Sequence, residues 1–337
     1  MSHSSWTRVV WVSALVAASA PCHAQVSRMT KDRPSAVVAK SHVFVFYSDP
    51  RTNLHDFLLN ASPNRLEDSN PQCLAGLRRK DREGFEQAQA YYKQAFGERR
   101  APRQLFVALR YHLAGFTVAE DTEELTAPAL AQLRAAEPAY KACWWPAADR
   151  RNRAWIAALK PLLAANEDAL RTRLESLYGT AFMLPHPVDV VGYVGFPSGN
   201  TFIDPNHTII SSTDPVNAGN AAVEMVFHEA SHALLGPNLG PVWQALQKAS
   251  EAVEMQQRPR DLWHALLFYT TGKAVAVRFA ETGVTYVPFV YGGGLFDRVW
   301  MDFRAPLERN WQPYLDGRAD LDTAAGGLMR DLRPSKP

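Results

Sequence analysis

Two histidines and a glutamate stand at a spacing that suits metal chemistry. His228, Glu229 and His232 form the pattern H-E-x-x-H. Residues four apart on a helix lie about one turn above each other, so both imidazoles can reach one ion from the same face. Glu229 can then take a proton from metal-bound water, whose pKa zinc lowers toward neutrality. The pattern therefore predicts a zinc site with Glu229 as general base.

The residues around this pattern are uncharged, which bears on whether the histidines are exposed. Residues 225–227, 230–231 and 233–234 carry no charge. The helix that holds them is therefore expected to be buried, where an unpaired imidazole is costly. A bare H-E-x-x-H also arises by chance, and the competing interpretation is a packed core helix without metal. The apolar flanks favour the metal.

A third ligand has to come from another part of the chain, and there are two candidates, Glu251 and His264. Over residues 242–253 the apolar residues share one helical face, and Glu251 projects to the opposite, polar side. His264 lies in residues 261–269, a helix that is apolar nearly all round and is therefore expected to be buried. A buried imidazole needs a partner, either a backbone carbonyl or a metal. The helical phase favours His264, and three imidazoles leave a coordination position open for water.

The motif resembles that of the zincin metallopeptidases, zinc hydrolases built on H-E-x-x-H, over about residues 201–272. This resemblance implies a zincin-like catalytic core, a peptide or protein substrate, and an antiparallel edge strand above the metal, here residues 207–211. The chain lacks the G-x-x-H continuation of the metzincin subgroup. The position of Glu251 is similar to that of the third ligand in the gluzincin subgroup, so a ligand at His264 would depart from that pattern.

Three further polar residues are candidates for supporting roles. Glu224 precedes His228 by one helical turn and is expected either to orient an imidazole N–H or to lie in solvent. Tyr269 and Tyr291 are candidate hydrogen-bond donors to a developing oxyanion. The alternative for both tyrosines is packing in the core.

The first residues have the layout of a secretory signal peptide. Arg8 precedes an apolar run over residues 9–18, and Cys22-His23-Ala24 offers small residues for cleavage after Ala24. The run is shorter than the roughly 20 residues of a membrane span. We therefore expect export to the periplasm or the medium. Cleavage leaves Cys73 and Cys143, which are predicted to form a disulfide in an oxidising compartment rather than to bind zinc.

Composition and element order predict an α+β fold. The net charge of +2 and the lack of a dense basic block give no case for nucleic acid binding, and 47% apolar residues suit a globular protein. We expect a mainly helical region over residues 25–180 and a metal-binding region over residues 181–337, and the alternative is that the two form one continuous domain. Strands are predicted at 43–47, 188–194, 201–203 and 207–211, and helices at 82–96, 104–114, 127–136, 155–163, 167–178, from 214 to 236, and from 261. The small sheet, antiparallel or mixed, precedes the H-E-x-x-H helix.

The sequence thus predicts an exported zinc-dependent hydrolase of the peptidase class. An alternative is an exported, non-catalytic binding protein with a structural or vestigial zinc site. Closure of the fourth coordination position by Glu251 or another protein group would favour that alternative. The oligomeric state is not predicted.

Overall fold

The computed structural model describes residues 33, 36–60, 70–97, 103–116, 120–194 and 198–333. The predicted signal peptide, residues 1–24, lies outside them. The fold is mainly helical with one small sheet, which confirms the α+β prediction. None of the helices in these ranges is both long and apolar enough to cross a bilayer.

The sheet is mixed and has five strands in the order β1-β2-β3-β5-β4. The strands are β1 (Val37–Lys40), β2 (Phe44–Tyr47), β3 (His186–Val191), β4 (Gly199–Ile203) and β5 (Asn206–Ser211). The pairs β2–β3 and β3–β5 are parallel, whereas β1–β2 and β4–β5 are antiparallel. The four predicted strands are present. Strand β1 was not predicted, because its residues show no alternation of apolar and polar side chains. In the structure its four residues are partly or fully exposed.

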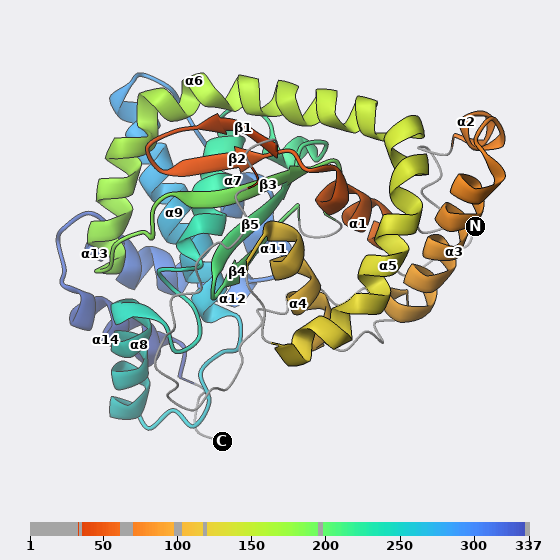
Figure 1. The fold of residues 1–337 in the computed structure, drawn as a ribbon. Coiled ribbons are helices and arrows are strands. Elements are labelled where there is room, and N and C mark those ends of the chain that lie inside the picture. Colours follow the sequence, from red (N-terminus) through yellow and green to blue (C-terminus); the bar gives the residue numbers. More distant parts are fainter. Residues whose placement is uncertain are drawn as a thin grey trace, which may run out of the picture.

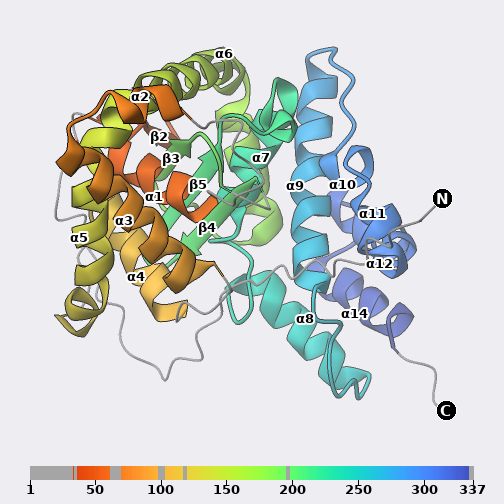
Figure 2. The same ribbon diagram turned by 90° about the vertical axis from the view of Figure 1, so that its right-hand side faces the viewer.

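Helices cover both faces of the sheet (Figure 2). On one side lie α1 (Pro50–Asn60), α3 (Arg79–Phe96), α4 (Arg103–Ala114) and α5 (Glu120–Cys143); on the other lie α7 (Asn220–Ser231) and α9 (Leu262–Glu281). Strand alternation sorts the side chains between the layers. Val188, Val190 and Ile210 join the core that includes α7. Val191, Phe202 and Ile209 form a separate cluster beneath α4.

One long helix, α6 (Trp145–Tyr178), runs along the edge of these layers (Figure 1). Two helices were predicted here, separated near Asn166, and α5 was predicted over residues 127–136 alone. Both helices are longer because their tertiary contacts outweigh the local pattern. Glu167 is buried and accepts hydrogen bonds from the backbone N–H groups of His42 and Val43, and Asn166 accepts one from Arg278.

The largest core cluster combines residues from both sides of position 180, including Phe44 and Leu170 as well as Phe227 and Leu266. Short elements complete the C-terminal part: α8 (Gly240–Ala252), α10 (Phe289–Gly292), α11 (Leu295–Arg298), α12 (Met301–Pro306), the π-helical η4 (Leu307–Trp311), α13 (Gln312–Leu315) and α14 (Leu321–Asp331). They pack around α9 and α8, away from α1, α3 and α4 (Figure 2).

Buried ion pairs lie on the side of the sheet that α1 and α4 cover. Asp189 of β3 bonds to Arg33 at 2.9 Å and to Nε2 of His207 at 2.6 Å. Arg110 of α4 forms a bidentate pair with Asp56 of α1. Burial favours the neutral acid, but Arg33 and His207 outweigh it and hold the pKa of Asp189 at about 2. Removing one partner of such a pair leaves a buried charge uncompensated, so these contacts stabilise the arrangement of β3 beside Arg33 and of α4 beside α1.

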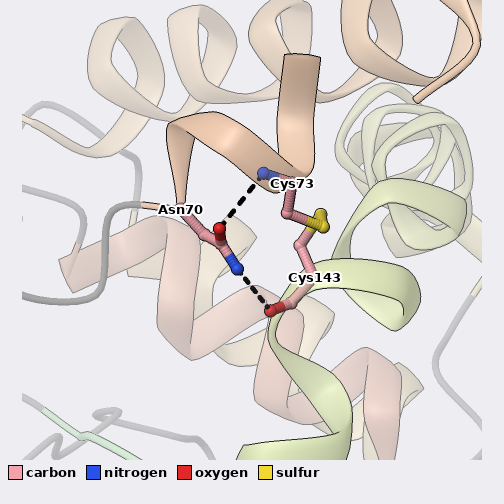
Figure 3. The surroundings of a disulfide bond; sticks show 3 residues. All are labelled: Asn70, Cys73 and Cys143. Carbon is pink, nitrogen blue, oxygen red and sulfur yellow. Dashed lines mark hydrogen bonds between the residues drawn. A yellow bond between two sulfur atoms is a disulfide. The ribbon is translucent and has the colours of Figure 1, made fainter. Parts of the chain in front are cut away.

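The predicted disulfide between Cys73 and Cys143 is present and joins α2 (Pro71–Ala75) to the end of α5. Asn70 bridges the same two segments, since its side chain accepts from the N–H of Cys73 and donates to the carbonyl of Cys143 (Figure 3). The bond closes a loop with a sequence separation of 70 residues. Such a crosslink restricts the unfolded chain.

Replacing both Cys73 and Cys143 by Ala should lower the free energy of unfolding by about 2–5 kcal/mol. Urea denaturation of the oxidised proteins measures the effect, and a reducing agent should bring the wild type to the level of the double variant. The hydrophobic cluster beside this disulfide is separate from the one that contains α7 and α9. Zinc affinity should therefore not change. An unaltered urea midpoint in the variant would contradict this prediction.

Candidate metal centre

The helix that carries the H-E-x-x-H pattern begins at Asn220, later than predicted. A 3-10 turn, η3 (Pro215–Asn217), follows Asp214, and Gly219 then adopts φ 57° and ψ −134°. This left-handed φ favours glycine and interrupts the helix. Asn217 does not cap α7; its side-chain amide donates to the carbonyls of Ser198 and Ser211 and so ties η3 to the sheet.

The same helix ends at Ser231, before the predicted stop at Gly236-Pro237. His232 is the C-cap residue. The N–H groups of residues 232–234 each donate to the carbonyl three residues earlier, as in the tightened last turn of a helix. Both histidines nevertheless remain on one face, with ring centroids 5.0 Å apart. The motif thus spans the last turn of α7.

His264 of α9 joins the two histidines of α7. Each of the three imidazoles offers one nitrogen, and these nitrogens lie within 4.8 Å of one another. The ring centroid of His264 is 5.4 Å from that of His228 and 5.2 Å from that of His232. These three histidines can therefore hold one metal ion. The expected convergence of two helices on one point is present.

The chemistry of this donor set fits a metal. His228 and His264 are buried, and their Nδ1 atoms have no hydrogen-bond partner within the described part of the chain. Burial lowers the pKa of His232 to about 4 and holds the pKa values of His228 and His264 well below their ordinary range. The rings are therefore neutral at physiological pH, which is the form that binds metal. Zinc accepts three such nitrogens and leaves a fourth position open.

Aromatic rings enclose the three histidines. Phe268 stacks on His228 with centroids 3.6 Å apart, and Trp263 stacks on His264 at 5.1 Å. Trp300 meets His264 edge-on at 5.3 Å, and its buried Nε1 has no hydrogen-bond partner among the residues described. These residues were not predicted as part of the site, because aromatic residues in apolar helices ordinarily form core.

Glu229 is 4% exposed and is held by strand β4. The hydroxyl of Thr201 lies 2.8 Å from its Oε2. A Cβ atom on Gly199 would lie 2.6 Å from its Oε1, so glycine permits this close approach. Burial raises the pKa of Glu229 to about 7, against the effect of the Thr201 hydrogen bond. A carboxylate with a pKa near neutrality suits a general base. Neither Thr201 nor Gly199 was predicted, because this contact joins residues far apart in sequence.

The strand beside Glu229 is β4 and not β5. Residues 207–211 were expected to be the edge strand, but β5 pairs with β3 on one side and with β4 on the other. In the antiparallel β4–β5 pair, Ser211 N–H donates to the carbonyl of Ser198. Alternation then directs the N–H and C=O groups of Gly199 and Thr201 away from β5, toward the free edge of the sheet.

Glu251, the other candidate ligand, lies apart from the histidines. It is exposed on α8 and accepts a hydrogen bond from Gln247 at 2.6 Å. No carboxylate joins the three imidazoles in the described ranges. The helical phase that predicted a solvated side chain at this position is confirmed.

Glu224 is neither solvated nor bonded to an imidazole, in contrast to both expectations. It is fully buried and accepts hydrogen bonds from the Tyr286 hydroxyl at 2.7 Å and from the Phe289 N–H at 3.0 Å. Burial raises its pKa to about 7, while these two donors oppose that rise. Phe289 contacts Phe268, which stacks on His228. Glu224 therefore anchors the segment that backs the histidines.

Tyr269 and Tyr291 direct their hydroxyls to other partners. Tyr269 donates to Gln312 at 2.6 Å and Tyr291 donates to Glu308 at 2.8 Å. Tyr269 follows His264 by five residues, which places it about 140° away around α9. The structure thus brings neither tyrosine to the three histidines. Their role as oxyanion donors stays a prediction without a contact to support it.

The resemblance to zincins rests on the H-E-x-x-H motif. No known protein family, curated protein or solved structure matches this chain. The ability of His228, His232 and His264 to hold a metal beside Glu229 is supported by their distances and burial alone.

His264→Ala should reduce zinc affinity by at least about 100-fold, because two nitrogens then remain for an ion that takes three. Competition with a chromophoric chelator measures the affinity, and elemental analysis gives the stoichiometry, expected to be one zinc per chain. Glu251→Ala is the matched control and should bind zinc like the wild type. Loss of zinc in the Glu251 variant with retention in the His264 variant would reverse the assignment.

Proposed function

We propose that this protein is a zinc-dependent hydrolase that cleaves peptide bonds. One observation carries the proposal: three imidazoles, of which His228 and His264 are buried and His232 is half-buried, converge within 4.8 Å, and the residue after the first is a buried glutamate. His228, His232 and His264 would hold the ion. Glu229 would act as the general base.

Zinc, when bound, lowers the pKa of a water molecule toward neutrality and polarises the carbonyl that this water attacks. Glu229 has Oε2 engaged by Thr201, whereas Oε1 has no hydrogen-bond partner in the described ranges. Oε1 would therefore accept the proton of the attacking water and pass it to the departing amine. The pKa of about 7 suits both transfers.

Strand β4 supports a peptide as the substrate. Its outer edge carries the N–H and C=O groups of Gly199 and Thr201 next to Glu229, and these groups have no sheet partner among the residues that the structure describes. An extended peptide can pair with such an edge through main-chain hydrogen bonds. The scissile bond would then lie against the Oε1 side of Glu229. The strand that would hold the peptide is β4, and not residues 207–211, which the resemblance to zincins led us to expect.

A non-catalytic protein with a structural zinc is the second candidate. It requires a fourth protein ligand, since structural zinc sites are closed. Three donors gather in the described part of the chain, and Glu251, the residue expected to close the site, is exposed. The open donor set favours the hydrolase.

Export also belongs to the proposal. The disulfide between Cys73 and Cys143 suits an oxidising compartment, and the N-terminal sequence has the pattern of a cleaved signal peptide. The hydrolase would then act on peptides or proteins in the periplasm or outside the cell.

Glu229→Gln should retain one zinc per chain and lower the hydrolytic rate by about 100- to 10,000-fold, because the amide cannot accept the proton. A library of quenched fluorescent peptides supplies the substrates, with chelation and zinc re-addition as the test of metal dependence. Glu251→Gln is the matched control and should leave the rate unchanged. Full turnover by the Glu229 variant would disprove the assignment of the base.

Gly199→Ala should lower kcat about tenfold and leave zinc bound. The new Cβ atom would stand 2.6 Å from Oε1 of Glu229, so the carboxylate must move, and a small misplacement of a catalytic group is costly. Gly192→Ala is the control, because a Cβ there meets no atom within 4 Å. Equal kcat values for the two variants would show that Gly199 does not set the position of Glu229.

A further inference from the structure

A chain of hydrogen bonds runs from Glu229 across the sheet to Asn206. The Thr201 hydroxyl lies 2.8 Å from Oε2 of Glu229 and 2.8 Å from the Thr208 hydroxyl. Thr208 in turn lies 2.7 Å from Nε2 of His186, and Nδ1 of His186 lies 2.9 Å from the Asn206 side-chain amide. Strands β3, β4 and β5 all contribute to it.

We propose that this chain holds Oε2 of Glu229 in place and leaves Oε1 free for the reacting proton, with Thr201 as the positioning residue. The inference rests on the proposed role of Glu229. It gives three residues, Thr201, Thr208 and His186, a role in positioning Glu229. None of them forms a hydrogen bond to His228, His232 or His264 in the described part of the chain.

The placement of these side chains follows from the sheet. Thr201 and Thr208 are cross-strand partners in the β4–β5 pair, so their side chains stand on the same face. Thr208 pairs with Val188, whose side chain joins the core that includes α7. His186 precedes Val188 by two residues and shares that face. The whole chain therefore lies on the side of the sheet that α7 covers.

The direction of the hydrogen bonds is set at Asn206. As the amide is oriented, its N–H donates to Nδ1 of His186, and Oδ1 is the buried atom without a partner. Nδ1 of His186 thus accepts, and the ring proton is on Nε2.

Each remaining donor then points toward the carboxylate. Nε2–H of His186 donates to Thr208, Thr208 donates to Thr201, and Thr201 has its hydrogen for Glu229. The Thr201 hydroxyl also lies 2.9 Å from the main-chain carbonyl of Glu229. The ionised carboxylate is the stronger acceptor. Bonds aligned in this way polarise one another.

The chain is shielded from water. His186 and Thr208 are 0% exposed, and Asn206 is 5% exposed. Burial lowers the pKa of His186 to about 3, so its ring is neutral and carries a single N–H. Solvent therefore does not compete for the bonds among Asn206, His186 and Thr208, whereas Thr201, at the end next to Glu229, is half-buried.

The first experiment compares Thr201→Val with Thr201→Ser. Valine keeps the shape and removes the hydroxyl, so kcat should fall about 10- to 100-fold. This is the factor expected from the loss of one hydrogen bond to a charged group. KM and zinc stoichiometry should match the wild type. Serine restores the hydroxyl and should recover at least about a third of kcat. Thr208→Val, which removes the next bond, should lower kcat by a smaller factor.

Three outcomes would overturn the proposal: kcat of Thr201→Val within twofold of the wild type, loss of zinc together with activity, or failure of serine to restore kcat. Should the valine variant not fold, Thr201→Ser and Thr208→Val carry the comparison. Failure of the proposed function itself is recognised separately, by a wild-type protein that binds no zinc or cleaves no peptide.

A second measurement does not depend on activity. The ¹⁵N chemical shifts of the His186 ring in the full chain report its tautomer. Protonation at Nε2 with a free Nδ1 supports the chain, whether or not hydrolysis is found. Protonation at Nδ1 would overturn the assigned direction. Asn206→Ala should release the tautomer preference and identify the signal.

Discussion

The desolvation of three imidazoles is the constraint on which this structure depends. His228 and His264 have buried ring nitrogens without a hydrogen-bond partner in the described part of the chain, which no ordinary core tolerates cheaply. One metal ion could accept a nitrogen from each of the three rings at once. The apolar surroundings of α7 and α9 keep the rings neutral, and neutral rings are the ones that bind metal.

The two faces of the sheet carry two different networks of polar side chains. On the face toward α4, buried Asp189 pairs with Arg33 and lies 2.6 Å from Nε2 of His207. On the face toward α7, His186 and Thr208 lead to Glu229. Because successive side chains of a strand alternate between faces, β3 and β5 each contribute to both networks. A one-residue slip of register would exchange the two sets.

The three histidines that could hold a metal were predictable because each has a local pattern: two histidines four residues apart, and His264 in a helix apolar nearly all round. The phase of Glu251 was likewise predictable from residues 242–253. The strands β2 to β5 followed from apolar runs and turns, whereas these patterns left the sheet either antiparallel or mixed. Helix α1 was missed because Asp49-Pro50 was interpreted as a turn, although Asp49 accepts hydrogen bonds from the N–H groups of Arg51 and Thr52 at the start of the helix. Contacts such as Thr201–Glu229 join distant segments, so no local pattern encodes them.

Two buried carboxylates on α7 show how partners assign different work to the same side chain. Glu224 and Glu229 lie five residues apart, about 140° around the helix, and burial raises the pKa of each to about 7. Both oxygens of Glu224 accept hydrogen bonds, from Phe289 and Tyr286, so it has no oxygen left for a reacting proton. Glu229 has one oxygen engaged by Thr201, and Gly199 leaves room beside the other. The raised pKa therefore does not distinguish the two glutamates. They differ in how many of their carboxylate oxygens accept hydrogen bonds, which is two in Glu224 and one in Glu229 among the described residues.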